Sequence, residues 1–274
     1  MIAHEEFARF ITMPHLKIGL RVECLRLPIR QAIRKASELG VAGIQVNAVG
    51  DLAPDNLSAT GRREFSQLIS SFGLQLTALG FPTRHGFSTA EGLEARIDAA
   101  QKVLSLSYAL RAPIVTGIIG RVPEDVSHPA RQLLTEALSA IGAHADRAGA
   151  VFAIETATES GATLRRFIDS LGPAGVRANL DPANLLVKGY DPIAAVRELN
   201  DAIVHTHARD ALREAGGELG REVTPGDGDL DWNEYLGALD EVGYRGWFTI
   251  KLDQTADPLR DVPRAIAFLT RFGA

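Results

Sequence analysis

Short apolar segments alternate regularly with longer amphipathic segments along this chain. The apolar segments are five or six residues long and are bounded by glycine, proline or polar residues, a pattern typical of buried β-strands. They predict strands at residues 17–22, 43–47, 74–79, 114–119, 151–155, 176–181 and 247–252, and another that begins at residue 202 and runs into the polar residues 204–210. Eight strands are therefore expected.

Between these strands, apolar residues recur at helical spacing. The pattern predicts helices at residues 28–39, 58–72, 91–110, 129–148, 162–171, 192–199, 232–242 and 259–272, with residues 211–231 as a long polar loop. Eight strand-then-helix units match one closed (β/α)8 TIM barrel, which needs about 250 residues. We assign this barrel to residues 16–274 and leave residues 1–15 as an N-terminal tail or short helix. A doubly wound open sheet is the alternative, but no glycine-rich phosphate motif follows the first strand.

Composition narrows the environment and the partners. With 46% hydrophobic and 23% charged residues, the chain has enough apolar material for a large core. The net charge of -5, with both signs dispersed, argues against nucleic acid and against an anionic membrane surface. The sequence shows no secretory signal and no long apolar span, and its single cysteine, Cys24, fits a reducing compartment. We therefore expect a cytoplasmic protein that binds neither nucleic acid nor a membrane.

Polar side chains gather where three of the predicted strands end. Glu155 closes the fifth strand and Asp181 the sixth, while His205, His207 and Arg209 alternate onto one face of the seventh. The carboxyl ends of TIM-barrel strands form the active-site face, so these groups are expected to converge. Glu155, Asp181 and His207 together suit Mn, Mg, Co or Zn. Each residue alone is more commonly a solvated strand end, and only the set predicts a metal site.

Five segments near these strand ends share a wider pattern. They are 154–159 (IETATE), 179–184 (NLDPAN), 205–210 (HTHARD), 222–232 (EVTPGDGDLDW) and 243–250 (GYRGWFTI). Together they resemble the sugar isomerase/epimerase superfamily of xylose isomerase-like TIM barrels, which also contains the AP endonucleases. The resemblance extends from residue 17 to residue 272, and it specifies the superfamily but no substrate.

This resemblance implies a divalent metal held by four side chains. Glu155, Asp181 and His207 match three of them, but the fourth is usually a glutamate on the eighth strand, where this chain has Lys251. Family members use two glutamates to exchange a proton with the sugar through a metal-stabilised enediolate, so Glu155 and Lys251 are the expected catalytic pair. The amine leaves three outcomes open. It replaces the metal as a built-in cation, it acts uncharged as the second base, or turnover is lost and only binding remains.

Other polar residues are expected around this centre. We predict that four residues bind substrate: His85, Asn184, Arg209 and Asp210. Asp253, which shares a strand face with Lys251, is a candidate substitute carboxylate, whereas His205 lies deeper and is expected to be packed and hydrogen-bonded. Residues 226–228 (GDG) lack the preceding strand and the following lysine of a P-loop, so a turn is expected there.

The leading functional hypothesis is a carbohydrate isomerase or epimerase that acts on a small keto-sugar, sugar acid or sugar phosphate. One alternative is a catalytically impaired or metal-free sugar-binding barrel, and another is a dehydratase or lyase of the same superfamily. AP endonuclease-like cleavage is disfavoured, because it needs several metals with more ligands than this chain offers and the charge does not favour DNA. A homo-oligomer remains open.

Overall fold

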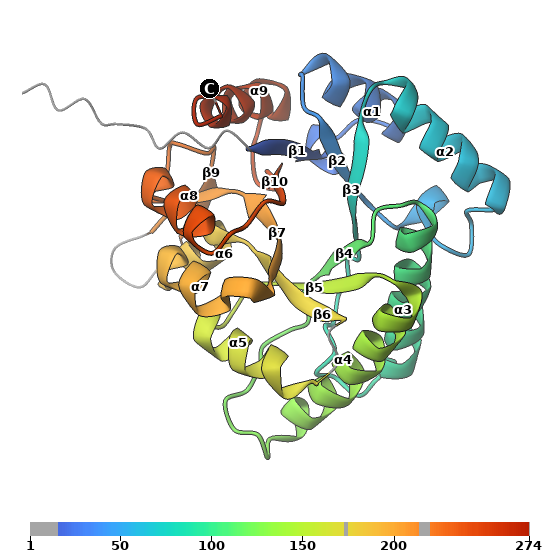
Figure 1. Cartoon of the computed structure of the whole chain (residues 1–274), viewed down its shortest axis with the longest axis vertical. Helices are drawn as coiled ribbons and strands as arrows, with labels where there is room; N and C mark the ends of the chain where they lie inside the picture. The colour runs from blue at the N-terminus through green and yellow to red at the C-terminus, as the bar shows by residue number, and fades with distance from the viewer. Residues whose placement is uncertain (1–15, 173–174, 214–219, 274) are drawn as a thin grey trace, which may run out of the picture.

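The computed structural model describes residues 16–172, 175–213 and 220–273, and it confirms the predicted TIM barrel (Figure 1). Eight parallel strands close in the order β1-β10-β7-β6-β5-β4-β3-β2. Their bounds are β1 Lys17–Arg21, β2 Gly43–Asn47, β3 Gln75–Gly80, β4 Ile114–Gly117, β5 Val151–Glu155, β6 Val176–Leu180, β7 Ile203–Ala208 and β10 Trp247–Ile250. The tail or short helix expected at residues 1–15 lies outside the described residues.

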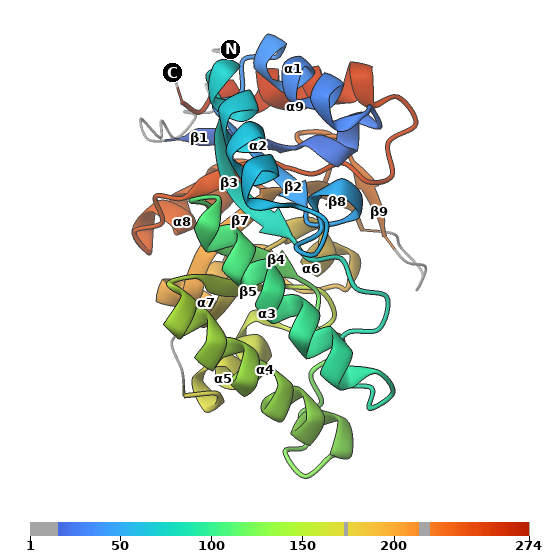
Figure 2. The same ribbon diagram turned by 90° about the vertical axis from the view of Figure 1, so that its right-hand side faces the viewer.

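Helices pack around the outside of the barrel (Figures 1 and 2). They are α1 Ile29–Glu38, α2 Ala59–Ser71, α3 Leu93–Ala109, α4 Pro129–Ala148, α5 Gly161–Ser170, α6 Pro182–Val187, α7 Pro192–Leu199, α8 Trp232–Glu241 and α9 Pro258–Thr270. Short 3-10 turns occupy Val22–Leu25, Gly50–Leu52 and Asn200–Ala202. The side chains of Ser58, Ser160 and Asp231 accept hydrogen bonds from first-turn backbone N–H groups, which explains where α2, α5 and α8 begin. No helix in the described ranges is long and apolar enough to cross a membrane.

The strands separate an apolar outer face from a polar inner layer. On β2, Ile44 and Val46 are buried in the apolar core, whereas the intervening Gln45 hydrogen-bonds across the barrel to Thr116 of β4. On β10, Phe248 and Ile250 belong to the core, and Thr249 faces inward. The core therefore lies between strands and helices, and the carboxyl end of the barrel interior is left to hydrogen-bonding residues.

Several elements of the described chain differ from the predictions. The expected loop at 211–231 contains an antiparallel hairpin, β8 Asp210–Leu212 with β9 Arg221–Val223, and α6 follows β6 directly. Arms of three residues and a helix of six are too short to show a period of two or of 3.6. The fourth strand also ends at Gly117, two residues earlier than expected.

Asp210 organises the turn that follows this hairpin. Its side chain is fully buried, and its carboxylate accepts hydrogen bonds from the backbone N–H groups of Ala211, Gly226, Gly228 and Leu230 and from the indole N–H of Trp232. A Cβ atom on Gly228 would lie 2.1 Å from Asp210 Oδ1, so only glycine fits there. The GDG segment is thus a turn, as predicted, wrapped around one carboxylate.

Replacement of Asp210 with asparagine should therefore destabilise the fold. The new NH2 group would face N–H donors, and we expect the free energy of unfolding to fall by about 2 to 3 kcal/mol. Urea denaturation followed by tryptophan fluorescence measures this change. Asp227→Asn in the same turn is the control; it removes only an exposed pair with Arg264 and should cost less than about 1 kcal/mol. Equal losses in the two variants would contradict this role for Asp210.

Candidate active site

Four predicted residues meet at the carboxyl end of the barrel. Glu155 is the last residue of β5, Asp181 follows β6, His207 lies near the end of β7, and Lys251 follows β10. These strands are consecutive neighbours in the closed sheet, so their ends lie side by side. Glu155, Asp181 and His207 each offer one ligand atom within 4.8 Å of the others. The cluster is therefore a candidate metal site, formed by the residues that the sequence singled out.

Asp181 carries the most deeply buried charge of this cluster. Its Oδ1 caps α6 by accepting the backbone N–H of Asn184 at 3.1 Å. Its Oδ2 lies 2.9 Å from Arg209 Nη1, 3.2 Å from His207 Nδ1 and 3.4 Å from Lys251 Nζ. Burial opposes ionisation, but the two cations and the histidine outweigh it and hold the pKa of Asp181 well below its ordinary value. These partners therefore favour the carboxylate form of Asp181.

Lys251 lies between the two carboxylates of the cluster. Its Nζ is 2.6 Å from Glu155 Oε1 and 3.4 Å from Asp181 Oδ2, and it is 3.9 Å from Asp253 Oδ2. Only 4% of Lys251 is exposed. The amine thus forms short contacts with two of the three residues that would hold a metal.

The two histidines occupy successive levels of the barrel interior. His207 Nε2 lies 3.3 Å from Gln45 Oε1, and the pKa of His207 is lowered by burial and by Lys251, against the pull of the carboxylates. Below it, His205 hydrogen-bonds with Asn179 at 2.8 Å and with Thr249 at 3.0 Å. Burial lowers the pKa of His205 well below its ordinary value. His205 is therefore packed and hydrogen-bonded, as expected.

Arg209 and Asn184, which we predicted to bind substrate, hydrogen-bond to the carboxylates of the cluster. Arg209 donates to Asp181 and, at 2.9 Å, to Asn184 Oδ1, and its other nitrogens contact Glu222 of β9. Asn184 in turn donates from Nδ2 to Glu155 Oε1 at 3.1 Å. Because its donors are engaged in this way, the Arg209 guanidinium fixes the positions of Asp181 and Glu222. The geometry therefore favours a positioning role for both Arg209 and Asn184.

A cavity of about 190 Å³ opens onto this cluster. Its charged lining consists of Arg21, Glu155, Lys251 and Asp253, and its other walls include Gln45, Asn47, Thr116 and the ring of Phe81. His85, which we predicted to bind substrate, is exposed and is not among the residues that line this cavity. Asp210 is buried in the turn described above and is not among the lining residues either.

Several residues at or near this cavity were not predicted from the sequence. Gln45 and Asn47 sit two apart on β2, so they share its inner face, and polar residues at this spacing in a buried strand were an available signal. Arg21 ends β1 and forms an ion pair with Asp253. Glu222 gave no such signal, because it reaches Arg209 only through the unpredicted hairpin.

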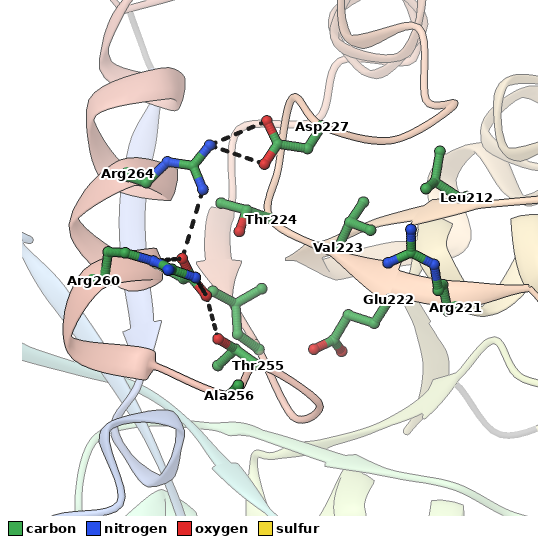
Figure 3. A pocket seen from close by; sticks show the side chains of 12 residues that line it. Leu212, Arg221, Glu222, Val223, Thr224, Asp227, Thr255, Ala256, Arg260 and Arg264 are labelled. Carbon is green, nitrogen blue, oxygen red and sulfur yellow. Dashed lines mark hydrogen bonds and ion pairs between the residues drawn. The ribbon is translucent and has the colours of Figure 1, made fainter.

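A second cavity, of about 330 Å³, lies between the β8–β9 hairpin and α9 (Figure 3). Within it Arg264 pairs with Asp227 and Asp261, and Thr255 contacts Asp261. Glu222 links this region to the cluster, because its Oε1 accepts the backbone N–H of Gln254 at 2.8 Å while its Oε2 holds Arg209. Glu222 therefore connects the wall of this cavity to the cluster.

The side chains of Glu155, Asp181 and His207 are of the types that bind a divalent metal, but the positive charges beside them oppose its binding. Glu155 and Asp181 are the anionic ligands that such an ion would need, and Lys251 and Arg209 already neutralise them. The ammonium also contacts Glu155 Oε1 and Asp181 Oδ2, so it lies against two of the three residues that would hold a metal. A dication and a charged Lys251 therefore do not fit the cluster together.

Comparison with known proteins places this geometry in a family. An inosose dehydratase of Lacticaseibacillus casei is 27% identical over 121 residues, which span 39% of this chain and 40% of that relative. The uncharacterized protein YfiH of Bacillus subtilis (strain 168) is 28% identical over 291 residues, 85% of this chain and 91% of that protein. The crystal structure of a xylose isomerase domain protein from Planctomyces limnophilus superposes with a TM-score of 0.82 at 25% identity, covering 94% of this chain and 97% of that one. The family profile of the xylose isomerase-like TIM barrel matches residues 33–272, and this chain therefore belongs to that family.

Proposed function

We propose that this protein enolises a small neutral polyhydroxy ketone, as a keto-sugar isomerase or epimerase does. One observation carries the proposal: a carboxylate, Glu155, and an ammonium, Lys251, lie 2.6 Å apart and line the same cavity. Removal of a proton from the carbon beside a carbonyl needs a base at that carbon and a positive group at the oxygen. Glu155 and Lys251 supply these two requirements.

The chemistry follows from the arrangement of their atoms. Glu155 takes the proton from the carbon next to the ketone, and the C–H electron pair forms the C=C bond of an enediolate. The carbonyl oxygen gains the negative charge, and a cationic N–H group beside it stabilises that charge. Return of the proton to the former carbonyl carbon, together with transfer of the adjacent hydroxyl proton to the charged oxygen, gives an isomer. Return of a proton to the original carbon from its opposite face gives an epimer.

The cavity lining favours a neutral substrate over a sugar phosphate or sugar acid. Lys251 is paired with Glu155, and Arg21 with Asp253, so the charged side chains that line the described part of the cavity compensate one another and leave no net positive charge for a phosphate. The volume of about 190 Å³ lies below the range of drug-sized pockets, about 300–1,000 Å³, and suits a single ring or a short open chain. Amide and hydroxyl groups of Gln45, Asn47 and Thr116 can bind sugar hydroxyls, and Phe81 can cover a C–H face.

A dehydratase is the second candidate. It shares the first step, after which the enolate expels the hydroxyl group β to the carbonyl, which takes the proton from Glu155 and leaves as water. Two observations favour it. The relatives named above include an inosose dehydratase. Of the two carboxylates that line the described part of the cavity, Asp253 is paired with Arg21, so only Glu155 is placed to act as a base. Elimination on one face needs one base, whereas epimerisation needs proton transfer at two faces.

Proton exchange with solvent tests the shared first step. In D2O, we expect the wild type to introduce deuterium beside the carbonyl of at least one neutral ketose or inosose, as detected by proton NMR. Glu155→Gln should slow this exchange by about 10²- to 10⁴-fold, because it removes the base. Exposed Glu136→Gln should leave it unchanged. Ligand-induced thermal stabilisation without any exchange would instead indicate the sugar-binding barrel.

Charge selectivity can be measured separately by binding. We expect the wild type to bind a neutral sugar alcohol, which it cannot enolise, at least about tenfold more tightly than the phosphate ester of that alcohol, because the charged groups that line the cavity already compensate one another and offer the ester no net positive charge. Isothermal titration calorimetry at fixed ionic strength gives both affinities. Tighter binding of the phosphate ester would contradict the proposal of a neutral substrate.

A further inference from the structure

The position of Lys251 suggests how this site differs from a metal centre. Its Nζ forms contacts of 2.6 Å with Glu155 Oε1 and 3.4 Å with Asp181 Oδ2, so a positive charge already lies where the two carboxylates converge. The side chain comes from the residue after β10, and only 6% of it is exposed. The ammonium is therefore part of the buried cluster and not a surface group that folds over it.

We propose that Lys251 is the resident cation of this site, that it takes the place of a divalent metal, and that its remaining N–H binds the carbonyl oxygen of the substrate. The first two statements concern the folded protein alone. The last one rests on the proposed function.

A count of charges supports the replacement. In the described cluster, Lys251 and Arg209 face Glu155, Asp181 and Glu222, which leaves one net negative charge. Addition of a dication would leave one net positive charge in a buried site. A glutamate at position 251 together with a dication would restore one net negative charge. The lysine is thus electrostatically equivalent to a glutamate plus a metal ion.

The donor geometry supports the role toward substrate. An ammonium has three N–H donors, and two of them are directed to Glu155 and Asp181. The nearest further acceptor among its ion-pair partners, Asp253 Oδ2, is 3.9 Å away, beyond hydrogen-bonding distance. Because Lys251 also lines the cavity, the third N–H is available to an oxygen bound there.

Metal content and metal binding test this proposal without any substrate. We expect wild-type protein, purified without chelators, to contain well under one equivalent of Mn, Co, Zn or Mg by elemental analysis. We also expect these ions to leave its melting temperature unchanged. Lys251→Glu should bind Mn²⁺ at least about a hundredfold more tightly than the wild type in calorimetric titration, because two units of charge change beside the ion.

Two further variants make the outcome decisive. Lys251→Met removes the ammonium without adding an acid, so it should lose thermal stability and regain part of it when Mn²⁺ is added. Lys17→Glu makes the same charge change as Lys251→Glu at the opposite end of the barrel and should behave like the wild type. Stoichiometric metal in the wild type, or equal Mn²⁺ affinity of the wild type and Lys251→Glu, would overturn the proposal.

Activity in the presence of chelator separates this inference from the proposed function. Deuterium exchange that persists in EDTA and is lost in Lys251→Met supports both. Exchange that EDTA abolishes and Mn²⁺ restores overturns the resident cation while the enolising function stands. A metal-free wild type with no exchange on any ketose leaves Lys251 as the structural cation and overturns its contact with substrate.

Discussion

The buried negative charge of Asp181 determines how the side chains at the carboxyl end of this barrel are arranged. An ionised group such as Asp181 costs several kcal/mol to bury unless the protein supplies cations and hydrogen-bond donors. Arg209, Lys251 and the α6 backbone supply them. Arg209 is held by Glu222 of β9, and Lys251 by Glu155 of β5. Compensation of this single charge therefore ties together five strands that are far apart in the sequence.

An ammonium and a divalent ion meet this requirement in different ways. A metal contributes two charges and open coordination positions that can hold two substrate oxygens at once. Lys251 contributes one charge and three N–H groups on a tether that cannot dissociate. A substrate bound here therefore depends more on the walls of the cavity for its orientation, which gives the side chains of Gln45 and Asn47 on β2 an importance that sequence reasoning did not assign.

The sequence predicted the barrel because each strand is a separate apolar segment, and it predicted the cluster because its members directly end neighbouring strands. It did not predict the partners of Arg209. Alternation places Arg209 on the face of His207, but β7 ends at Ala208, and the guanidinium then turns to Asp181 and Glu222. Gln45 was missed because only closure of the barrel brings it to His207, 162 positions along the chain.

The pairing of Glu155 with Lys251 also determines how charge would move during the proposed enolisation. Glu155 Oε1 accepts hydrogen bonds from Lys251 and Asn184, so Oε2, on the side of His207, is the oxygen suited to take the proton. As the proton arrives, Glu155 loses its negative charge and the substrate oxygen gains one. Lys251 adjoins both positions, so it exchanges one anionic partner for another with little movement. The net charge of the buried cluster and its substrate stays constant, and the cation is already in place when the enediolate forms.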